Sequence, residues 1–312
     1  MLHLIQKVVN PLSNQPSLND YIEDISDLIT SSLLEIFPSN WDVPSNLKES
    51  MTYSLLAGGK RLRPLLVITA CEALGGRREV AIEAACSVEM VHTYSLIHDD
   101  LPAMDDDDYR RGKLTNHKVY GEAMAILAGD GLLTHAFFSL AQIARKHGIP
   151  SDRVLAIVED LAEMAGPRGM VGGQVADMEG EQGLTSISQL EYIHTHKTSD
   201  LFIFSLIAGG RIAGADEAKI TALRSFGHHI GLAFQIQDDI LDLIGDEAKL
   251  GKKTQSDVKQ DKVTYPYFIG LDESKLEVAR LTHEAKRVII EAGFPHPERL
   301  LEIADYLVNR DH

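Results

Sequence analysis

The sequence contains few cysteines, few basic residues and no long apolar segment. Cys71 and Cys86 are the only cysteines in 312 residues, so a disulfide scaffold is not expected and a reducing cytoplasm fits. No run of eighteen apolar residues occurs, so no membrane-spanning helix is predicted. Lysine and arginine total 30 against 46 aspartates and glutamates, which argues against nucleic acid as the main partner.

Signals for β-strands are also missing. No segment alternates convincingly between apolar and polar residues, and no glycine-rich turn joins a strand to a helix. Apolar residues recur instead with helical spacing, as in the segment LNDYIEDISDLITSSLLEIF. Helical patterns cover residues 18–37, 46–74, 78–101, 118–147, 151–165, 168–181, 187–208, 216–245, 273–292 and 297–309. We predict a loosely ordered leader over 1–18 and one all-α domain over 19–312, a single bundle of about ten helices.

An unusually acidic segment, HDDLPAMDDDDYRRG, spans residues 98–112 and has six aspartates in ten positions. Asp99, Asp100 and Asp105 form the pattern D-D-x-x-x-x-D. Pro102 disfavours helix for the residue before it, so the helix should end near Leu101 and Asp105 should fold back towards Asp99. The remaining aspartates of the segment cannot all be ligands, and some are expected in solvent.

A second acidic motif, FQIQDDILD, follows a mostly apolar stretch. Asp238 and Asp242 are four residues apart and project from one helix face, with Asp239 on the flank of that face. Carboxylates this close repel one another unless a cation is present. A solvated acidic surface is the alternative explanation for each motif alone. Two such clusters without Cys or His favour a site for Mg²⁺ or Mn²⁺ that is completed by substrate phosphates.

Basic residues accompany the acidic motifs. Lys60 and Arg63 are three residues apart on the helix predicted over 46–74, whereas Arg61 is expected to be a surface charge. His92 lies on the helical stripe that ends in Asp99. Further basic or polar residues near the motifs are Arg110, Arg111, Lys197, Thr198, Lys252 and Lys262. Each alone is compatible with a surface position, but together they predict two diphosphate pockets, one bridged by metal and one purely cationic.

The chain resembles the trans-isoprenyl diphosphate synthases, and most closely the bacterial farnesyl diphosphate synthases. The resemblance runs from about residue 50 to the C-terminus, with motifs in the family's order: GGKRLRP, LIHDDLPAMDDDDYRRGKLTNHKVYGEAMAILAGD, GGQVADMEGE, HKTSDLF, FQIQDDILD and DKVTYP. It implies a helical bundle around a deep central cavity, usually a homodimer. One departure is Gln255, where bacterial relatives usually carry glycine. This difference bears on the conformation of the loop around Gln255 and not on the resemblance.

The resemblance also implies a reaction and a role for each motif residue. The reaction is Mg²⁺-dependent condensation of isopentenyl diphosphate with an allylic diphosphate, dimethylallyl or geranyl. Three Mg²⁺ are expected per site, and Mn²⁺ can substitute. The implied metal ligands are Asp99, Asp100, Asp105, Asp238 and Asp242, with Asp239 beside them. Arg110, Lys197 and Lys262 would hold the allylic diphosphate, and Lys252 would be a further substrate-binding residue. Thr198 and Gln235 would place oxygens near the developing cation. Lys60, Arg63, His92 and Arg111 would bind isopentenyl diphosphate.

The length of the product depends on what closes the cavity. Ser95 and Tyr94 precede Asp99 by four and five residues, which places them about 6–7.5 Å deeper along the helix. The helical wheel puts Ser95 beneath Asp99 and leaves Tyr94 as a plain core aromatic. The resemblance favours Tyr94 as the floor, because bacterial farnesyl synthases carry an aromatic residue there. We therefore expect mainly farnesyl diphosphate, with geranylgeranyl diphosphate as the alternative product.

Two other classes of protein stay open. A terpene cyclase shares the ionisation chemistry but needs no second diphosphate pocket, and Lys60, Arg63 and the intact DDILD argue against it. A non-catalytic subunit of a prenyl synthase usually loses aspartates, whereas both motifs here are complete. Gln174 and Asp177 face the same side of one predicted helix, and a pocket role and simple core hydrogen bonding are equally compatible with that spacing.

Overall fold

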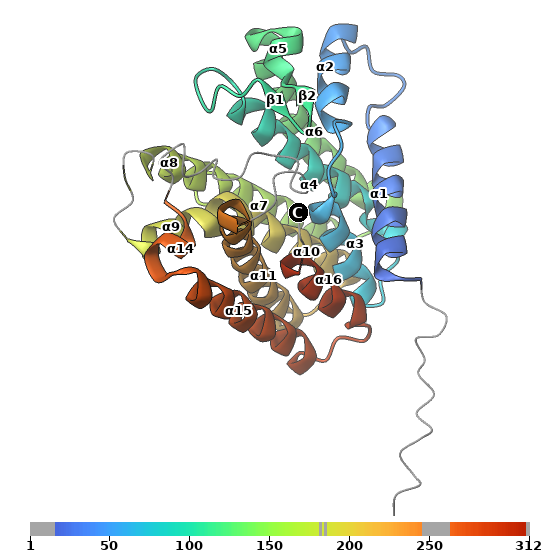
Figure 1. Cartoon of the computed structure of the whole chain (residues 1–312). Coiled ribbons are helices and arrows are strands. Elements are labelled where there is room, and N and C mark those ends of the chain that lie inside the picture. Colours follow the sequence, from blue (N-terminus) through green and yellow to red (C-terminus); the bar gives the residue numbers. More distant parts are fainter. Residues whose placement is uncertain (1–15, 181–182, 184–185, 245–262, 310–312) are drawn as a thin grey trace, which may run out of the picture.

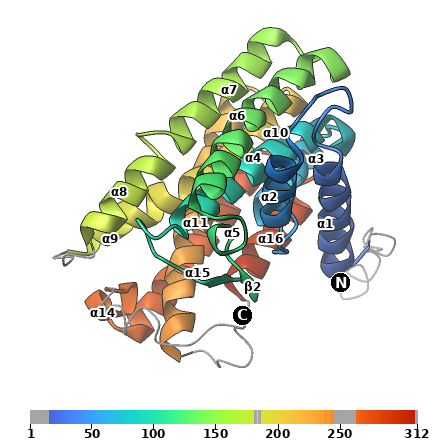
Figure 2. The ribbon, with the colours of Figure 1, turned by 90° about the horizontal axis from the view of Figure 1, so that it is seen from above.

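The computed structural model describes residues 16–180, 183, 186–244 and 263–309. These residues form a bundle of packed helices, seen from two directions in Figures 1 and 2. The first half contains α1 (Leu18–Leu34), α2 (Ser45–Leu55), α3 (Leu62–Ala73), α4 (Arg78–Asp99), α5 (Asn116–Tyr120), α6 (Glu122–His147) and α7 (Ser151–Ala165). The second contains α8 (Met170–Gly180), α9 (Ile187–Ile193), the π-helix η2 (His194–Ser199), α10 (Asp200–Ala213), α11 (Glu217–Ile244), α14 (Tyr265–Ile269), α15 (Leu271–Glu291) and α16 (Glu298–Val308). The all-α prediction is confirmed.

Helix α10 lies at the centre of the bundle because it is apolar on every side. All its residues from Leu201 to Gly210 are buried, and a helix that is hydrophobic all round must be enclosed by others. It packs against α3, α4, α7 and α11, while α6 covers α4 and α15 covers α11. The core therefore fixes the directions of α4 and α11, the two helices that carry the acidic motifs.

Helix α1 begins at Leu18, and a capping box fixes this start. The backbone N–H of Asp20 donates to the Ser17 hydroxyl, and the Asp20 carboxylate accepts from the Ser17 N–H, so two N–H groups of the helix end are satisfied. Pro16, Ser17 and Leu18 are thus described residues that fall within the predicted leader over 1–18. The rest of the predicted leader, residues 1–15, lies outside the described residues.

Two local predictions are wrong. The single helix expected over 46–74 is two helices, because Gly58, Gly59 and Arg61 take positive φ angles of 93°, 122° and 49° between α2 and α3. Lys60 therefore precedes α3 and does not share a helix face with Arg63. A short antiparallel hairpin, β1 (Tyr109–Arg110) with β2 (Lys113–Leu114), also occurs where no strand was expected. Gly112 and Arg111, both with positive φ, make its turn.

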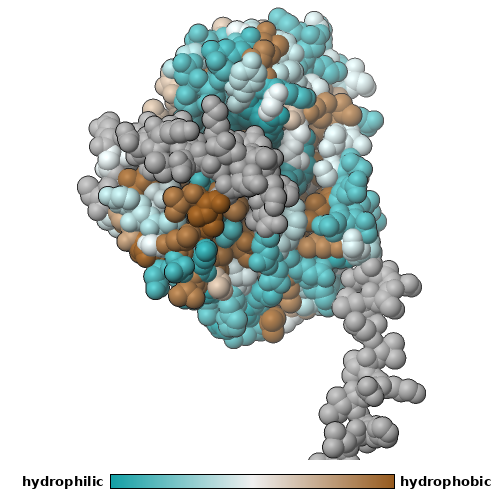
Figure 3. Space-filling view, in the orientation of Figure 1, coloured by the Kyte–Doolittle hydropathy of each residue, from teal (hydrophilic) through white to brown (hydrophobic). Residues whose placement is uncertain are grey.

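Apolar side chains are exposed at several places on the bundle. Figure 3 shows apolar groups on the face that carries the ends of α11, α14 and α15; the exposed large ones on these helices are Leu243, Ile244, Tyr267, Ile269, Leu276 and Ile290. Helix α6 is the one described helix apolar enough, by length and composition, to cross a membrane, with a mean hydropathy of 1.4 and 44% of that window buried. It packs along α4 in the bundle, as a core helix does.

Candidate active site

The first acidic motif lies where α4 ends. Asp99 is the last helical residue, and the chain then turns so that the backbone N–H of Asp105 donates to the Asp99 carbonyl over 2.9 Å. Asp106 has a φ of 52°, a left-handed conformation that aspartate tolerates in turns. Asp105 thus folds back to Asp99, as predicted. Burial raises the pKa of the Asp99 carboxyl, and the nearby Asp105 carboxylate raises it further.

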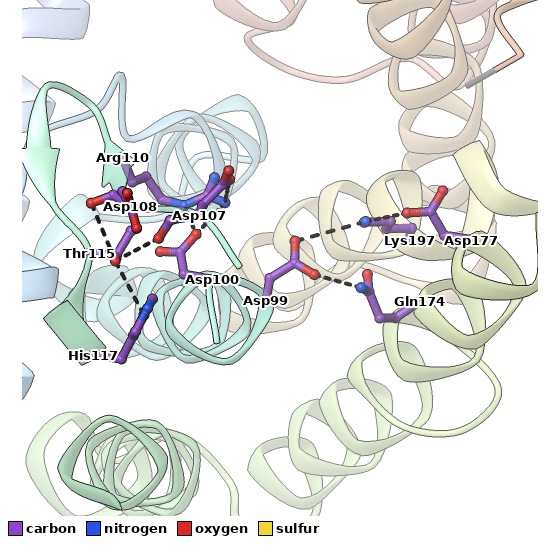
Figure 4. A network of polar contacts seen from close by, with 10 residues as sticks. All are labelled: Asp99, Asp100, Asp107, Asp108, Arg110, Thr115, His117, Gln174, Asp177 and Lys197. Atoms are coloured by element: carbon purple, nitrogen blue, oxygen red, sulfur yellow. Dashed lines mark hydrogen bonds and ion pairs between the residues drawn. The ribbon is translucent and has the colours of Figure 1, made fainter. Parts of the chain in front are cut away.

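Asp100 is held by an arginine from the hairpin. It is only 4% exposed, and its Oδ1 accepts from Nε of Arg110 at 2.6 Å and lies 2.5 Å from Nη2. Two nitrogens of one guanidinium thus share a single carboxylate oxygen, and both contacts are charge-assisted. Burial raises the pKa of Asp100 and the Arg110 guanidinium opposes that rise. The hairpin missed by the sequence patterns is therefore the element that presents Arg110 to the end of α4 (Figure 4).

The later aspartates of the run lie further out. Asp108 pairs with Lys118 at 2.7 Å and its side chain is 62% exposed, and Asp107 lies 3.6 Å from Arg110 with a side chain 47% exposed. The Thr115 hydroxyl donates to the Asp107 carbonyl over 2.7 Å and thereby holds the hairpin closed. These contacts agree with the expectation that part of the acidic run is solvated.

Helix α8 faces the same carboxylates. Nε2 of Gln174 donates to Oδ1 of Asp99 over 2.6 Å. Nζ of Lys197 donates to Oδ2 of Asp177 over 2.6 Å and lies 3.9 Å from Oδ2 of Asp99. Figure 4 shows these side chains pointing towards one another from α4, α8 and η2. The spacing of Gln174 and Asp177 is compatible with a pocket role and with simple core hydrogen bonding. Their contacts with Asp99 and Lys197 favour the pocket role.

Lys197 and Thr198 lie in a π-helix. The sequence pattern predicts one continuous helix over 187–208, whereas residues 194–199 form the wider turns of η2. Such π segments occur frequently at functional sites. Helix α8 can approach η2 because residue 173 is glycine: a Cβ there would lie 2.2 Å from the Lys197 backbone nitrogen. The absence of a side chain at residue 173 thus determines how closely α8 packs against η2, the element that carries Lys197.

The second acidic motif lies at the C-terminal end of α11. Asp239 and Asp242 are 8% and 1% exposed, and Asp238 is half-buried. Oδ2 of Asp239 accepts from the Tyr265 backbone N–H over 2.7 Å, which anchors the first turn of α14. Within the described part of the chain, no three His, Cys, Asp or Glu side chains already converge as metal ligands. The roles of Asp238, Asp239 and Asp242 stay predictions.

A second group of cations surrounds His92 on α4. Burial lowers the pKa of Arg63 to about 10, and its Nε is buried without a hydrogen-bond partner. Its guanidinium lies 5.2 Å from the Phe202 ring centre, a distance typical of cation–π contacts. Burial, followed by Arg63, Arg111 and other arginines, holds the pKa of His92 well below its ordinary value. An unpartnered buried donor beside a neutral histidine suits an anionic ligand better than a closed core.

Neighbouring backbone groups complete this cationic group. Arg111 donates to the Gly58 carbonyl, and a Cβ at residue 59 would lie 2.6 Å from Nη1 of Arg111, so glycine leaves room for the guanidinium. The expectation that Arg61 is a surface charge is wrong. It is 4% exposed and its Nη1 donates to the buried Glu89 carboxylate over 2.5 Å. The sequence pattern suggested that Arg61 points outward because it assumed one unbroken helix over 46–74, whereas Arg61 lies between α2 and α3.

The remaining predicted residues are placed in part. Tyr94 is 7% exposed and packs edge-on against His98, with ring centres 5.7 Å apart. The Ser95 hydroxyl donates to the His92 carbonyl over 2.9 Å. Gln235 lies on α11, about one turn before Asp238. Lys252, Lys262 and Gln255 lie outside the described residues.

Acidification is expected to destabilise the protein partly through His194. This side chain is buried next to Asp239, at 3.6 Å, and burial lowers its pKa to about 4. The unfolded chain, with an ordinary histidine pKa near 6.5, binds the proton first. Stability that depends on neutral His194 is therefore present above pH 6.5 and is lost as the pH falls towards 4, by up to about 3 kcal/mol.

This can be measured by urea unfolding of the wild type and of His194→Gln at several pH values between 7 and 4. The free energy of unfolding should fall less steeply with pH in the variant. Equal slopes for the two proteins would show that His194 does not titrate in this way.

The fold and the site define a class of protein: a helical bundle in which partly buried carboxylates at the end of one helix lie two turns from a cluster of cationic side chains around His92. Comparisons with known proteins narrow this class. The family model "Polyprenyl synthetase" matches residues 44–291. A farnesyl diphosphate synthase of Bacillus subtilis is 48% identical over 95% of this chain and 99% of its own length, and one of Geobacillus stearothermophilus is 47% identical over 96% and 99%.

Solved structures agree. An FPP/GFPP synthase from Zymomonas mobilis superposes with a TM-score of 0.81 at 33% identity, covering 93% of this chain and 98% of that one. Geranylgeranyl pyrophosphate synthases of plant chloroplasts also match, at up to 46% identity. The chain belongs to the polyprenyl synthetase family.

Proposed function

We propose that the chain is a Mg²⁺-dependent trans-prenyltransferase. It condenses isopentenyl diphosphate with dimethylallyl or geranyl diphosphate, and farnesyl diphosphate is its main product. The observation that carries this proposal is the position of Asp99 and His92 on one helix, seven residues and about 10 Å apart. Carboxylates and Lys197 gather around Asp99, and arginines gather around His92. Two adjacent diphosphates with their reacting carbons between them fit this spacing.

The residues around Asp99 suit Mg²⁺. They offer only oxygen ligands, and burial already disfavours the charged Asp99 in the absence of a cation, so a divalent ion would relieve a real electrostatic cost. Asp99, Asp100, Asp105, Asp238 and Asp242 would hold it, with three ions expected per site. When bound, Mg²⁺ neutralises charge on a departing pyrophosphate. Arg110 and Lys197, now paired with Asp100 and Asp177, are the chain's own cations for the same diphosphate.

The second pocket would hold isopentenyl diphosphate. Arg63 on α3, His92 on α4 and Arg111 in the turn of the hairpin would supply the donors, and Lys60 follows the two glycines before α3. Oxygens of Thr198 and Gln235 would face the developing allylic cation, and the apolar walls of the bundle keep water away from it. Lys252 and Lys262 are proposed as further ligands of the allylic diphosphate.

The direct test uses the purified chain. It is incubated with Mg²⁺, labelled isopentenyl diphosphate and each allylic primer in turn, and the products are separated by chromatography. Farnesyl diphosphate from both primers is the expected result. A cyclic hydrocarbon would indicate a terpene cyclase, and no product at any primer concentration would indicate a non-catalytic subunit.

Replacing Tyr94 with a smaller residue is expected to lengthen the product. Tyr94 is buried one turn before His98 and packs edge-on against its ring. If Tyr94 is the floor of the cavity, Tyr94→Ala should open room for a further isoprene unit. Chromatography should show a shift from farnesyl towards geranylgeranyl diphosphate, whereas the control Tyr94→Phe, which keeps the ring, should still stop at farnesyl. A Tyr94→Ala enzyme that also stops at farnesyl would place the floor elsewhere.

We also propose a cytoplasmic homodimer. Helix α6 and the adjacent α5 expose the apolar side chains Val119, Ile126 and Leu127, which are 43%, 44% and 54% accessible in the single chain. A second copy of the chain would remove them from water. Light scattering during gel filtration should give twice the chain mass of 34.4 kDa, and Leu127→Lys should shift it towards the monomer.

A further inference from the structure

Arg61 and Glu89 form a buried ion pair next to the proposed pocket for isopentenyl diphosphate, and the chemistry above uses neither. Nη1 of Arg61 donates to Oε1 of Glu89 over 2.5 Å, and the two residues are 4% and 2% exposed. Nη2 of Arg61 donates to the Leu55 carbonyl over 2.6 Å. One side chain therefore connects the end of α2, the start of α3 and the middle of α4.

The backbone at Arg61 is strained, and these contacts hold it in place. Its φ of 49° and ψ of 37° are left-handed, a conformation that costs a residue with a Cβ about 1–2 kcal/mol. Such conformations persist only where the surroundings over-determine them. Arg61 lies directly between Lys60 and Arg63 in the chain, so the contacts that fix its backbone also fix where those two cations begin.

Glu89 has a second effect, through its charge. It lies three residues before His92, on the same side of α4. Its carboxylate favours the charged forms of both Arg63 and Arg111, which burial disfavours. The buried Glu89 carboxylate therefore offsets the mutual repulsion of the neighbouring arginines before any diphosphate arrives.

We infer that Arg61 and Glu89 are positioning residues, which hold Lys60 and Arg63 in the geometry that binds the diphosphate of isopentenyl diphosphate. The inference rests on the proposed function. A positioning role and a purely electrostatic role of Glu89 predict opposite effects of its removal on anion binding. If Glu89 only added negative charge to the pocket, its removal would strengthen the binding of an anion; if it positions Arg61, its removal weakens binding.

The experiment measures KM for both substrates in Glu89→Gln and Arg61→Lys. Glutamine keeps the size of Glu89 and removes its charge, and lysine keeps the charge of Arg61 but cannot reach Glu89 and Leu55 together. Since a displacement of about 1 Å in a positioned group can cost up to a hundredfold, KM for isopentenyl diphosphate should rise at least tenfold in each variant. KM for the allylic substrate should stay within twofold and kcat within threefold.

A matched control is the ion pair Asp160–Arg211, at 2.6 Å, in which Asp160 is 6% exposed and the Arg211 side chain is 19% exposed. Asp160→Asn should lower the melting temperature as Glu89→Gln does and leave both KM values within twofold. An unchanged or lowered KM for isopentenyl diphosphate in Glu89→Gln would overturn the inference, as would an equal rise for both substrates. If Glu89→Gln does not fold, Arg61→Lys decides alone. A wild-type enzyme that does not condense the two substrates would instead refute the proposed function.

Discussion

Asp99→Asn is expected to lower the rate of condensation about a thousandfold and to leave the fold intact. Asparagine keeps an oxygen that can accept the hydrogen bond from Gln174, so the contact between α4 and α8 survives. It removes the charge that a divalent cation needs, and losing one preorganised electrostatic contact to a transition state costs on the order of 10²–10³ in rate. Chelation of divalent ions with EDTA should abolish the wild-type activity for the same reason.

The stability of the same variant gives an independent check. Burial raises the pKa of Asp99, which means that the folded protein disfavours the charged carboxylate. Neutralising it should therefore raise the free energy of unfolding at pH 7 without metal, measured by urea denaturation. Asp108→Asn is the matched control from the same acidic run: its side chain is 62% exposed, and turnover should stay within twofold. An Asp99→Asn enzyme with near-normal turnover would show that the ligands are misassigned.

Arg63→Ala is expected to raise KM for isopentenyl diphosphate about a hundredfold and to change KM for the allylic substrate less than threefold. Nε of Arg63 is buried without a hydrogen-bond partner, and burial lowers the pKa of the guanidinium to about 10. Its contact with an anion is therefore worth about 3 kcal/mol, and each 1.4 kcal/mol is a factor of ten in affinity. Arg63→Lys should lie between wild type and alanine, because lysine keeps the charge and loses the planar fork.

The control for this substitution is an exposed arginine. Arg287 pairs with Glu284 and Glu291 on the surface of α15, with a side chain 47% exposed, and Arg287→Ala should leave both KM values unchanged. Steady-state kinetics with one substrate varied at a time separates the two constants. Equal effects of Arg63→Ala on both substrates would mean that the two pockets are one.

Much of the site was predictable because its signals are local. The turn that returns Asp105 to Asp99 follows from Pro102, and the helix stripe through His92 and Asp99 follows from helical spacing. Both concern residues fewer than ten apart. The bundle was predictable for a related reason: an apolar pattern such as that of α10 has few ways to be buried.

The rest depended on contacts between distant segments. The burial of Arg61 follows from its contact with Glu89, 28 residues away, which the spacing around Arg61 does not indicate. The break before α3, in contrast, has a local signal in the pair Gly58-Gly59. The pairing of Gln174 with Asp99 spans 75 residues. The π-helix η2 has no distinctive residue pattern, and it packs against α8 and α11, which are distant from it in the sequence.

A π segment amounts to one residue more than the same stretch of α-helix would need. Helix α9 and helix α10 are therefore out of phase by about 100°, the rotation that one residue contributes. Deleting a single residue within 194–199 would bring them back into phase and swing Lys197 away from Asp99, while every buried contact of α10 stays where it is. Packing in the core fixes the rotation of α10 about its own axis, and the proposed substrate pocket requires a different rotation for the turn that carries Lys197. One continuous α-helix could not satisfy both requirements, and the extra residue separates them.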